Sequence, residues 1–125
     1  MKPFHERRRH PRVAESLPFQ VGTAAHWVAT RTINLSCGGA LCVLPESVPV
    51  LTKLQVSLEV PVAPANGGPS VREIHCEGVV VRQQPSSTPG QASLFETAIF
   101  FSDLQPEDRR CLAEFILQRM LSHGA

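Results

Sequence analysis

Four arginines lie close together near the start of the chain, in the run Arg7-Arg8-Arg9-His10-Pro11-Arg12. A guanidinium is a planar fork of donors that can clamp a phosphate or bind O6 and N7 of guanine, and its flat face can stack on a purine. An extended chain can separate the Cα atoms of Arg8 and Arg12 by at most about 13–14 Å. Pro11 disfavours helix at His10. The run therefore predicts a flexible clamp for one bulky anionic ligand, and the alternative is a solvated basic tail.

A second polar cluster is Asn34-Leu35-Ser36-Cys37-Gly38-Gly39, at the end of an expected strand. Asn34 and Ser36 alternate with Leu35, so their side chains should share one face. Their short polar groups can bind a base edge or a phosphate through hydrogen bonds. Gly38 and Gly39 allow the backbone to turn and a ligand to approach closely. The alternative for this cluster alone is an ordinary Asx-type turn.

The formal net charge of +1 is unevenly distributed along the chain. Residues 1–12 hold five basic groups and one acid, a net of +4, whereas residues 13–125 hold seven basic groups and ten acids, a net of −3. Nucleic-acid-binding domains usually spread basic charge over a face. With one Trp and no Tyr, the chain also lacks stacking platforms for single strands. The distribution argues against nucleic acid and favours a small anionic ligand.

Nothing in the sequence indicates catalysis or a metal centre. Ser36 is not part of a Gly-x-Ser-x-Gly motif, and no carboxylate pair, Cys/His dyad or Gly-rich phosphate loop is present. The N-terminus has no apolar targeting stretch, so we expect a cytoplasmic protein without membrane insertion. In that reducing compartment the cysteines, which form no Cys-x-x-Cys pair, should be free thiols in the core: Cys37, Cys42, Cys76 and Cys111.

The 125 residues fit one domain, and 11 prolines with 8 glycines favour a turn-rich β fold over a helical bundle. Alternating apolar residues and β-branched runs predict six strands joined as hairpins in a sheet or small barrel. Because proline cannot donate to a ladder, Pro18 predicts that the first strand lies on an edge. The expected strands cover residues 17–22, 27–35, 40–44, 54–61, 71–82 and 94–101.

The C-terminal segment changes to helical periodicity and predicts a helix over about residues 104–122. Asp103 is the expected N-cap, and Pro106 suits the first turn. The apolar positions recur at helical spacing, which favours packing against the sheet, with a dimerisation helix as the alternative. These positions are Leu112, Phe115, Ile116 and Met120.

Together the two polar clusters resemble the PilZ domain family, through Arg-x-x-x-Arg at Arg8 and Arg12 and Asn-x-Ser-x-x-Gly from Asn34 to Gly39. The resemblance covers about residues 6–121 and includes the last strand and the helix. It implies a mainly all-β fold, a six-stranded antiparallel β-barrel with a C-terminal α-helix, in a stand-alone member of the family. Residues 1–13 would form a flexible arm, and residues 14–125 the barrel with its helix.

The resemblance also implies a bacterial receptor for the second messenger cyclic di-GMP. By analogy Arg8 and Arg12 would grip guanine and phosphate, Asn34 and Ser36 would bind guanine from the barrel surface, and Gly39 would permit the turn. The ligand would be the only small molecule required, with no further cofactor and no metal.

Arg7 lies directly before the arginine motif, and in this family an arginine there implies an intercalated dimer of two stacked ligands. Additional candidates for ligand contact are Arg9, His10, Arg31 and Gly38. Signalling would follow from a ligand-induced change in contacts with an unidentified downstream protein. The alternative is a PilZ-like adaptor or scaffold that acts without the ligand.

Overall fold

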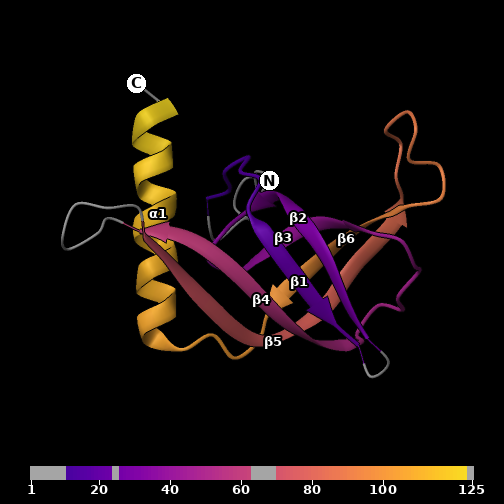
Figure 1. Ribbon diagram of the computed structural model, residues 1–125, viewed down its shortest axis with the longest axis horizontal. Coiled ribbons are helices and arrows are strands. Elements are labelled where there is room, and N and C mark those ends of the chain that lie inside the picture. The colour runs from indigo at the N-terminus through magenta and orange to yellow at the C-terminus, as the bar shows by residue number, and fades with distance from the viewer. Residues whose placement is uncertain (1–10, 24–25, 63–69, 124–125) are drawn as a thin grey trace, which may run out of the picture.

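In the computed structural model the chain is a closed antiparallel barrel with one helix at its end (Figure 1). The structure describes residues 11–23, 26–62 and 70–123. Around the barrel the strands follow the order β1-β2-β3-β6-β5-β4. The fold class expected from the sequence is therefore confirmed. The elements are β1 (Pro18–Gly22), β2 (Trp27–Leu35), β3 (Gly39–Leu44), β4 (Lys53–Val62), β5 (Ser70–Pro85), β6 (Phe95–Phe101) and α1 (Pro106–His123).

The barrel is filled by the apolar residues that alternate along each strand. In β4 every second residue from Leu54 to Val60 is buried, as expected for a strand with one face to the core. The residues of all six strands and of α1 that point inward form a single buried cluster. Cys42 and Cys76 belong to it as small apolar side chains, and all four cysteines are free thiols, as expected.

The prediction that β1 is an edge strand is wrong, because β1 pairs with β2 on one side and with β4 on the other. Pro18 is tolerated for a different reason. It is the first residue of β1 and pairs only with Arg31 of β2, since the ladder with β4 begins at Phe19. A proline at the first position of a strand removes no ladder hydrogen bond on the side where the partner strand is absent.

The helix begins at Pro106, two residues later than expected, and Asp103 is not its N-cap. The carboxylate of Asp103 instead accepts a hydrogen bond from the backbone N–H of Glu77, in the middle of β5. The carbonyl of Gln105 accepts the N–H of Arg109 in the first turn, which makes Gln105 the residue that flanks the helix. Pro106 occupies the first helical position, where its missing N–H costs nothing.

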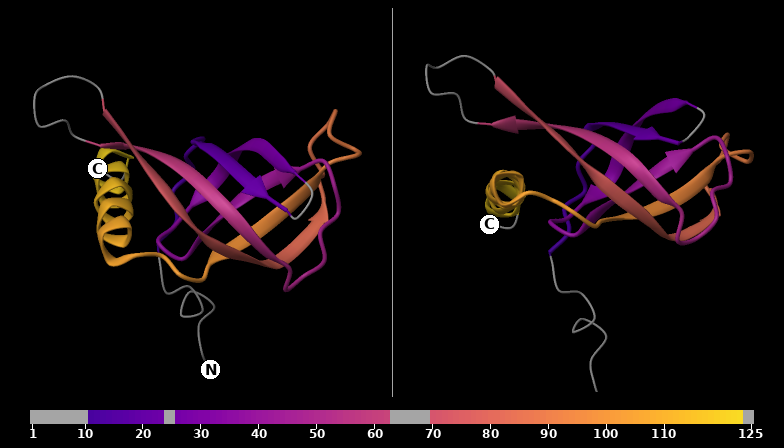
Figure 2. Two further views of the ribbon diagram at one scale, coloured as in Figure 1. Left: turned by 60° about the horizontal axis from the view of Figure 1, so that its bottom comes forward. Right: turned by 90° about the horizontal axis from the view of Figure 1, so that it is seen from below.

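The helix stands at one end of the barrel and packs against β4, as both views of Figure 2 show. Leu112, Phe115 and Ile116 are buried in the common core, which confirms that the apolar stripe faces the barrel. Met120, the fourth position of that stripe, remains 39% exposed. An ion pair between Arg72 of β5 and Asp108 fastens the first turn of α1, with 2.9 Å between Nε and Oδ1.

Candidate functional site

The segment that enters the barrel is joined to the end of β2 by a single two-residue bridge. The N–H of Val13 donates to the carbonyl of Leu35, and the N–H of Leu35 donates to the carbonyl of Val13, both over 2.9 Å. Both side chains are buried. Arg12, the last residue of the arginine run, is thereby held beside the second polar cluster through its neighbour Val13.

The bridge determines which side chains face outward beside it. In an antiparallel pair the neighbours of two inward residues point to the other face, and Arg12 lies opposite Ser36 when Val13 lies opposite Leu35. Arg12 is exposed, and Asn34 and Ser36 are half-buried. The outer surface at this end of β2 therefore carries one guanidinium, one amide and one hydroxyl.

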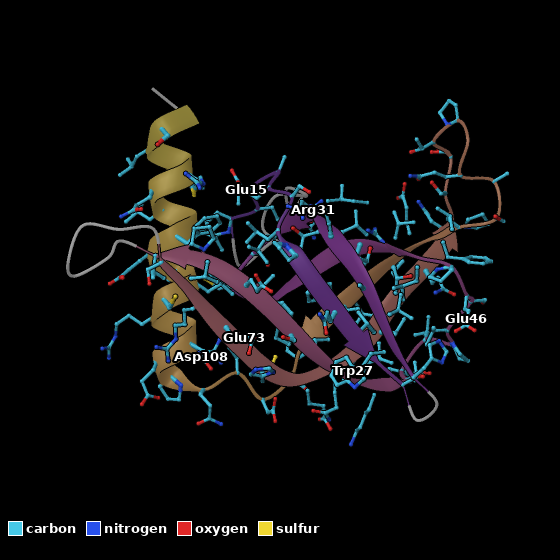
Figure 3. The ribbon with its side chains drawn as sticks, in the orientation of Figure 1. Glu15, Trp27, Arg31, Glu46, Glu73 and Asp108 are labelled. Carbon is cyan, nitrogen blue, oxygen red and sulfur yellow. The ribbon has the colours of Figure 1, made fainter. Side chains whose placement is uncertain are left out.

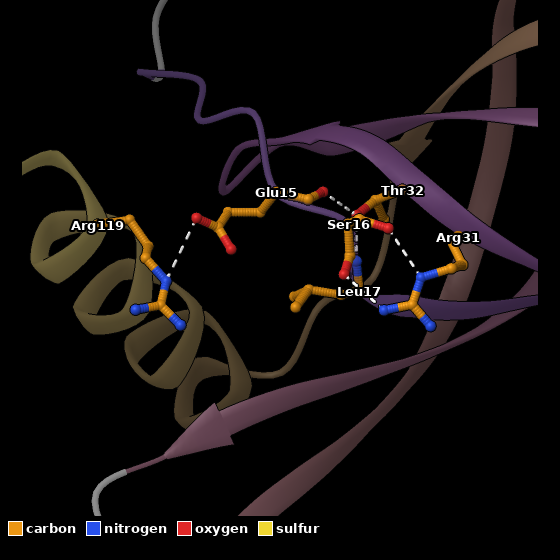
Figure 4. Close-up of polar contacts among 6 residues, drawn as sticks. All are labelled: Glu15, Ser16, Leu17, Arg31, Thr32 and Arg119. Atoms are coloured by element: carbon orange, nitrogen blue, oxygen red, sulfur yellow. Dashed lines mark hydrogen bonds and ion pairs between the residues drawn. The ribbon is translucent and has the colours of Figure 1, made fainter. Parts of the chain in front are cut away.

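The segment after the bridge is held against β2 by side chains of that strand (Figure 4). Thr32 is buried, and its hydroxyl accepts the N–H of Leu17 at 2.9 Å and donates to the carbonyl of Glu15. Arg31 donates from Nε to the Ser16 hydroxyl at 2.7 Å and from Nη2 to the Ser16 carbonyl at 2.8 Å. These bonds hold residues 15–17, which follow Arg12 and Val13 along the chain, against β2.

The same segment also contacts the helix. Glu15 forms an ion pair with Arg119 of α1, with 3.3 Å between Oε2 and Nε, and the Arg119 guanidinium lies 4.7 Å from the centre of the Phe115 ring (Figure 4). Phe115 is part of the core. A movement of the segment at Glu15 would therefore change its ion pair with Arg119 in the second half of α1.

The turn between β2 and β3 is closed by Ser36. Its hydroxyl oxygen accepts the N–H groups of Gly38 and Gly39 at 3.1 and 3.2 Å, and its backbone N–H donates to the Gly39 carbonyl at 2.9 Å. The Ser36 O–H is directed at the same carbonyl over a long 3.4 Å. Two acceptor sites are thus used by the turn, and the weakly bound O–H is the group that a ligand oxygen or nitrogen could take over.

Gly39 is required by the close approach of β6. A Cβ built on Gly39 would lie 2.1 Å from the carbonyl oxygen of Ile99, which is backbone and cannot rotate away. Gly38 contributes through its carbonyl, which accepts the N–H of Phe101 at 2.8 Å. The glycines of this motif therefore have a structural role in the barrel, independent of any ligand.

A bulge in β2 changes the orientation of Asn34. The register with β3 shifts between Thr32, opposite Cys42, and Asn34, opposite Leu41. Because of the extra residue, both Thr32 and Leu35 point inward although they are three positions apart. Asn34 therefore lies on the outer side next to the Ser36 turn, as expected from the sequence. The cause is the bulge, which simple alternation along the strand does not predict.

The other candidate residues divide into two groups. Four of them, Arg7, Arg8, Arg9 and His10, lie outside the described residues, as does most of the expected arm of residues 1–13. Arg31 is bound to Ser16 as described above, and it also lines a shallow depression of about 420 Å³ on the outside of β2. Of the other candidate residues that the structure describes, none lines that depression.

Two residues that the sequence did not nominate lie beside the turn. Phe100 of β6 is directly opposite Gly39 in the β3–β6 ladder and is 48% exposed. Arg109 of α1 acts on Cys37: burial raises the pKa of the Cys37 thiol, and the positive charge of Arg109 opposes that rise. A second cation therefore lies close to the turn. Only the pairing of β3 with β6 and the docking of α1 bring these residues here, so no local sequence signal could have identified them.

Within the described ranges no helix is long and apolar enough to cross a membrane. Groups of three or more His, Cys, Asp or Glu side chains that could hold a metal ion are also absent from those ranges. The polar groups described at the turn are the donors of Asn34 and Ser36 and the cation of Arg12, which suit an anionic ligand.

Comparison with known proteins gives a family and a fold. The profile of the PilZ domain matches residues 6–118. The structure of the inhibitor of motility MotI/DgrA from Bacillus subtilis superposes with a TM-score of 0.81 at 21% identity; the alignment covers 100% of this chain and 59% of that one. The PilZ domain of Escherichia coli YcgR with c-di-GMP gives a TM-score of 0.65 at 17% identity, covering 93% of each chain.

A complex of MrkH from K. pneumonia with c-di-GMP superposes with a TM-score of 0.66 at 16% identity, over 94% of this chain and 54% of that one. This chain thus spans about three fifths of the MotI/DgrA structure and about half of the MrkH structure. No curated protein matches the sequence. At these identities the solved structures establish the shared fold.

Proposed function

Because the chain belongs to the PilZ domain family, we propose that it is a receptor for cyclic di-GMP. The proposed ligand carries two phosphodiester charges and two guanines, which match the arginines and the polar turn. Arg8 and Arg12 would grip phosphate and guanine, and Asn34 and Ser36 would bind the edge of a guanine. The presence of c-di-GMP in the YcgR and MrkH structures supports the choice of ligand.

The observation that carries the proposal is the Val13–Leu35 bridge. Arg12 is the neighbour of Val13 and Ser36 is the neighbour of Leu35, which supports the proposal that the two halves of the family motif contact one ligand. Charge-assisted hydrogen bonds from guanidinium to phosphate are about twice as strong as neutral ones. Asn34 and the O–H of Ser36 add donors that recognise a base edge.

Arg7 supports a stoichiometry of two stacked ligands per chain. Two such ligands would carry four phosphodiester charges, and the arginines at positions 7, 8, 9 and 12 would supply four positive charges. The additional candidates are Arg9, His10, Arg31 and Gly38. Arg31 in particular has its guanidinium engaged by Ser16, so we assign it the positioning of the segment before β1.

The signal would pass through the segment that follows Arg12. A ligand that draws Arg12 towards the turn acts on a segment bound to α1 through Glu15 and Arg119. A change in that ion pair would alter the surface that the helix presents to a downstream protein. In this respect the proposed mechanism is a ligand-induced change in protein–protein contacts.

Isothermal titration calorimetry with cyclic di-GMP tests the proposal. The wild type should bind, and Arg8→Ala and Arg12→Ala should each weaken binding by at least tenfold, about 1.4 kcal/mol or more, because each loses a hydrogen bond to a charged group. Arg110→Ala, which removes an exposed arginine of α1, is the matched control and should bind as the wild type does.

A wild type that does not bind cyclic di-GMP would overturn the proposal and favour the ligand-independent adaptor. Equal affinity in both arginine variants and the wild type would overturn the assignment of the site. A stoichiometry of two ligands per chain would support the role of Arg7, and a stoichiometry of one would contradict it.

A further inference from the structure

Phe100 occupies the outer face of the barrel beside the candidate site. It pairs with Gly39 of β3 on one side and with Val79 of β5 on the other. Its neighbours along β6, Ile99 and Phe101, are buried, so the alternation of the strand directs the Phe100 ring outward. The ring is 48% exposed and lies one strand away from the turn that Ser36 closes.

This exposure leaves a large flat apolar surface in water. Among the described residues the aromatic pair of the barrel is Phe19 with Phe101, on the inside, and no ring or cation contact is found for Phe100. An exposed aromatic ring is stabilised when another planar group covers it. An aromatic residue that contributes little to the core and lies beside a ligand site has the chemistry of a stacking platform.

Trp27, another aromatic residue of the barrel, has a structural role and serves as a comparison. Trp27 also lies opposite a glycine, Gly22, and a Cβ on Gly22 would meet the indole ring at 2.9–3.0 Å. The indole therefore covers its glycine. At Gly39, by contrast, the nearest atoms to a Cβ are backbone atoms of Ile99 and Phe100. The Phe100 ring is not needed to cover Gly39, so its face is available.

We propose that the ring of Phe100 is a stacking surface for one guanine of cyclic di-GMP, so that the site extends from the β2–β3 turn onto β6. This inference rests on the proposed function, because it assigns one more contact to the same ligand. Gly39, the residue opposite Phe100, has no side chain that could lie between a planar base and the ring. The stacked base would keep its edge free for Asn34 and Ser36.

The affinity of Phe100→Ala for cyclic di-GMP, measured by calorimetry, tests this role. Stacking of a base on an aromatic residue gives an expected loss of about tenfold. Phe100→Trp retains a flat ring and should bind cyclic di-GMP with an affinity close to that of the wild type. Val71→Ala is the matched control, since Val71 is an exposed apolar residue of β5 eight positions from Val79, roughly 26 Å along the strand, and should leave binding unchanged.

Fluorescence provides a readout that a merely structural role would not change. Trp27 is the only tryptophan, and it lies in β2 roughly 23 Å along the strand from Asn34. In the double variant Trp27→Phe/Phe100→Trp the only indole is at position 100. A stacked guanine should quench it on addition of cyclic di-GMP, whereas the emission of the wild type should stay unchanged.

The possible outcomes separate the two proposals. If the wild type binds and Phe100→Ala binds equally well, or if the indole at position 100 is not quenched, the inference is wrong while the receptor function stands. If the wild type does not bind at all, the receptor function fails and this inference with it. Thermal melts followed by circular dichroism must show that each variant folds, and a folded Phe100→Trp variant decides the question where Phe100→Ala is unstable.

Discussion

Two glycines of the barrel wall each lie opposite an aromatic residue, and the second of these pairs lies beside the candidate site. Gly22 is covered by Trp27 at the end where β1 meets β2. Gly39 lies opposite Phe100 where β3 meets β6, but its space is occupied by the backbone of β6. Figure 3 shows Trp27 well separated from Glu15 and Arg31, which lie on the side where the chain enters the barrel.

The difference teaches that the same pair of residue types can pack together at one end and leave an aromatic ring uncovered beside the candidate site at the other. At the Trp27 end the polar contacts are exposed, as in the 3.7 Å pair of His26 with Glu46. At the Gly39 end backbone hydrogen bonds from Val13 and Leu35 bring distant segments together. A rigid turn whose Ser36 O–H is only weakly bound, next to the exposed Phe100 ring, is a suitable place for a ligand.

The largest expected effect is that of Gly39→Ala. The new methyl group would lie 2.1 Å from the Ile99 carbonyl oxygen, and only a shift of β3 or β6 can relieve this contact. We expect the free energy of unfolding to fall by about 3 kcal/mol or more in urea denaturation. Gly22→Ala is the control, with a loss of about 1 kcal/mol, because the exposed Trp27 ring can move.

Equal losses in the two glycine variants would contradict this comparison. They would mean that the backbone of β6 moves away from a new methyl group as easily as the Trp27 indole does. The turn would then be less rigid than its contacts indicate. A small loss for Gly39→Ala together with full affinity for the ligand would have the same meaning.

A second, smaller effect concerns the segment that carries Arg12. Thr32→Val removes the buried hydroxyl that accepts the Leu17 N–H and donates to the Glu15 carbonyl. Both backbone groups lose this hydrogen bond. We expect a loss of about 2 kcal/mol in the free energy of unfolding and weaker binding of cyclic di-GMP.

Thr30→Val is the control on the same strand, two residues nearer to Trp27. Its hydroxyl donates one bond, to the Val43 carbonyl at 2.8 Å, so we expect a loss of about 1 kcal/mol and unchanged ligand affinity. If both threonine variants bind the ligand equally, the segment does not position Arg12 as described.

The smallest effect on stability at neutral pH is that of the buried thiols of the barrel, because their titration changes the free energy of unfolding only at alkaline pH. Burial raises the pKa of Cys42 and that of Cys76 to about 12, above the ordinary value of 9.0. Between these values the folded state holds a proton that the unfolded state releases, so raising the pH favours unfolding. Each thiol should therefore lower the free energy of unfolding by about 1.4 kcal/mol per pH unit above pH 9.

Urea titrations at pH 8, 9 and 10 measure this dependence. Cys42→Ala should reduce the slope between pH 9 and pH 10, because one of the two thiols no longer titrates. The Cys37 thiol, in the turn beside Gly39, is half-buried and also has a raised pKa, with burial as the larger cause. A slope that is unchanged in Cys42→Ala would show that the core thiol is not shielded from solvent.

Much of the fold follows from the sequence because its signals are local. Alternation and β-branched runs located all six strands, and β2 has the expected bounds of Trp27 and Leu35. Helical spacing identified Leu112, Phe115 and Ile116 as the buried face of α1. These signals depend only on residues a few positions apart.

The errors arose where pairing across the barrel decides the outcome. Pro18 indicated an edge strand, but closure gives β1 two neighbours and moves the proline to the start of the ladder. Asp103 has the residue type of a helix cap, but its carboxylate accepts the backbone N–H of Glu77 in the middle of β5 instead. In the site, Asn34, Ser36 and Gly39 form a local motif, whereas Phe100 joins them only through the β3–β6 ladder.

Amide NMR spectra recorded during a titration with cyclic di-GMP test the central claim most directly, because they report on both ends of the barrel at once. The account predicts that the amide signals of Leu35, Gly38 and Gly39 shift, while those of Gly22 and Thr23 do not. A spectrum that stays unchanged at excess ligand, or that shifts most at Gly22, would contradict it.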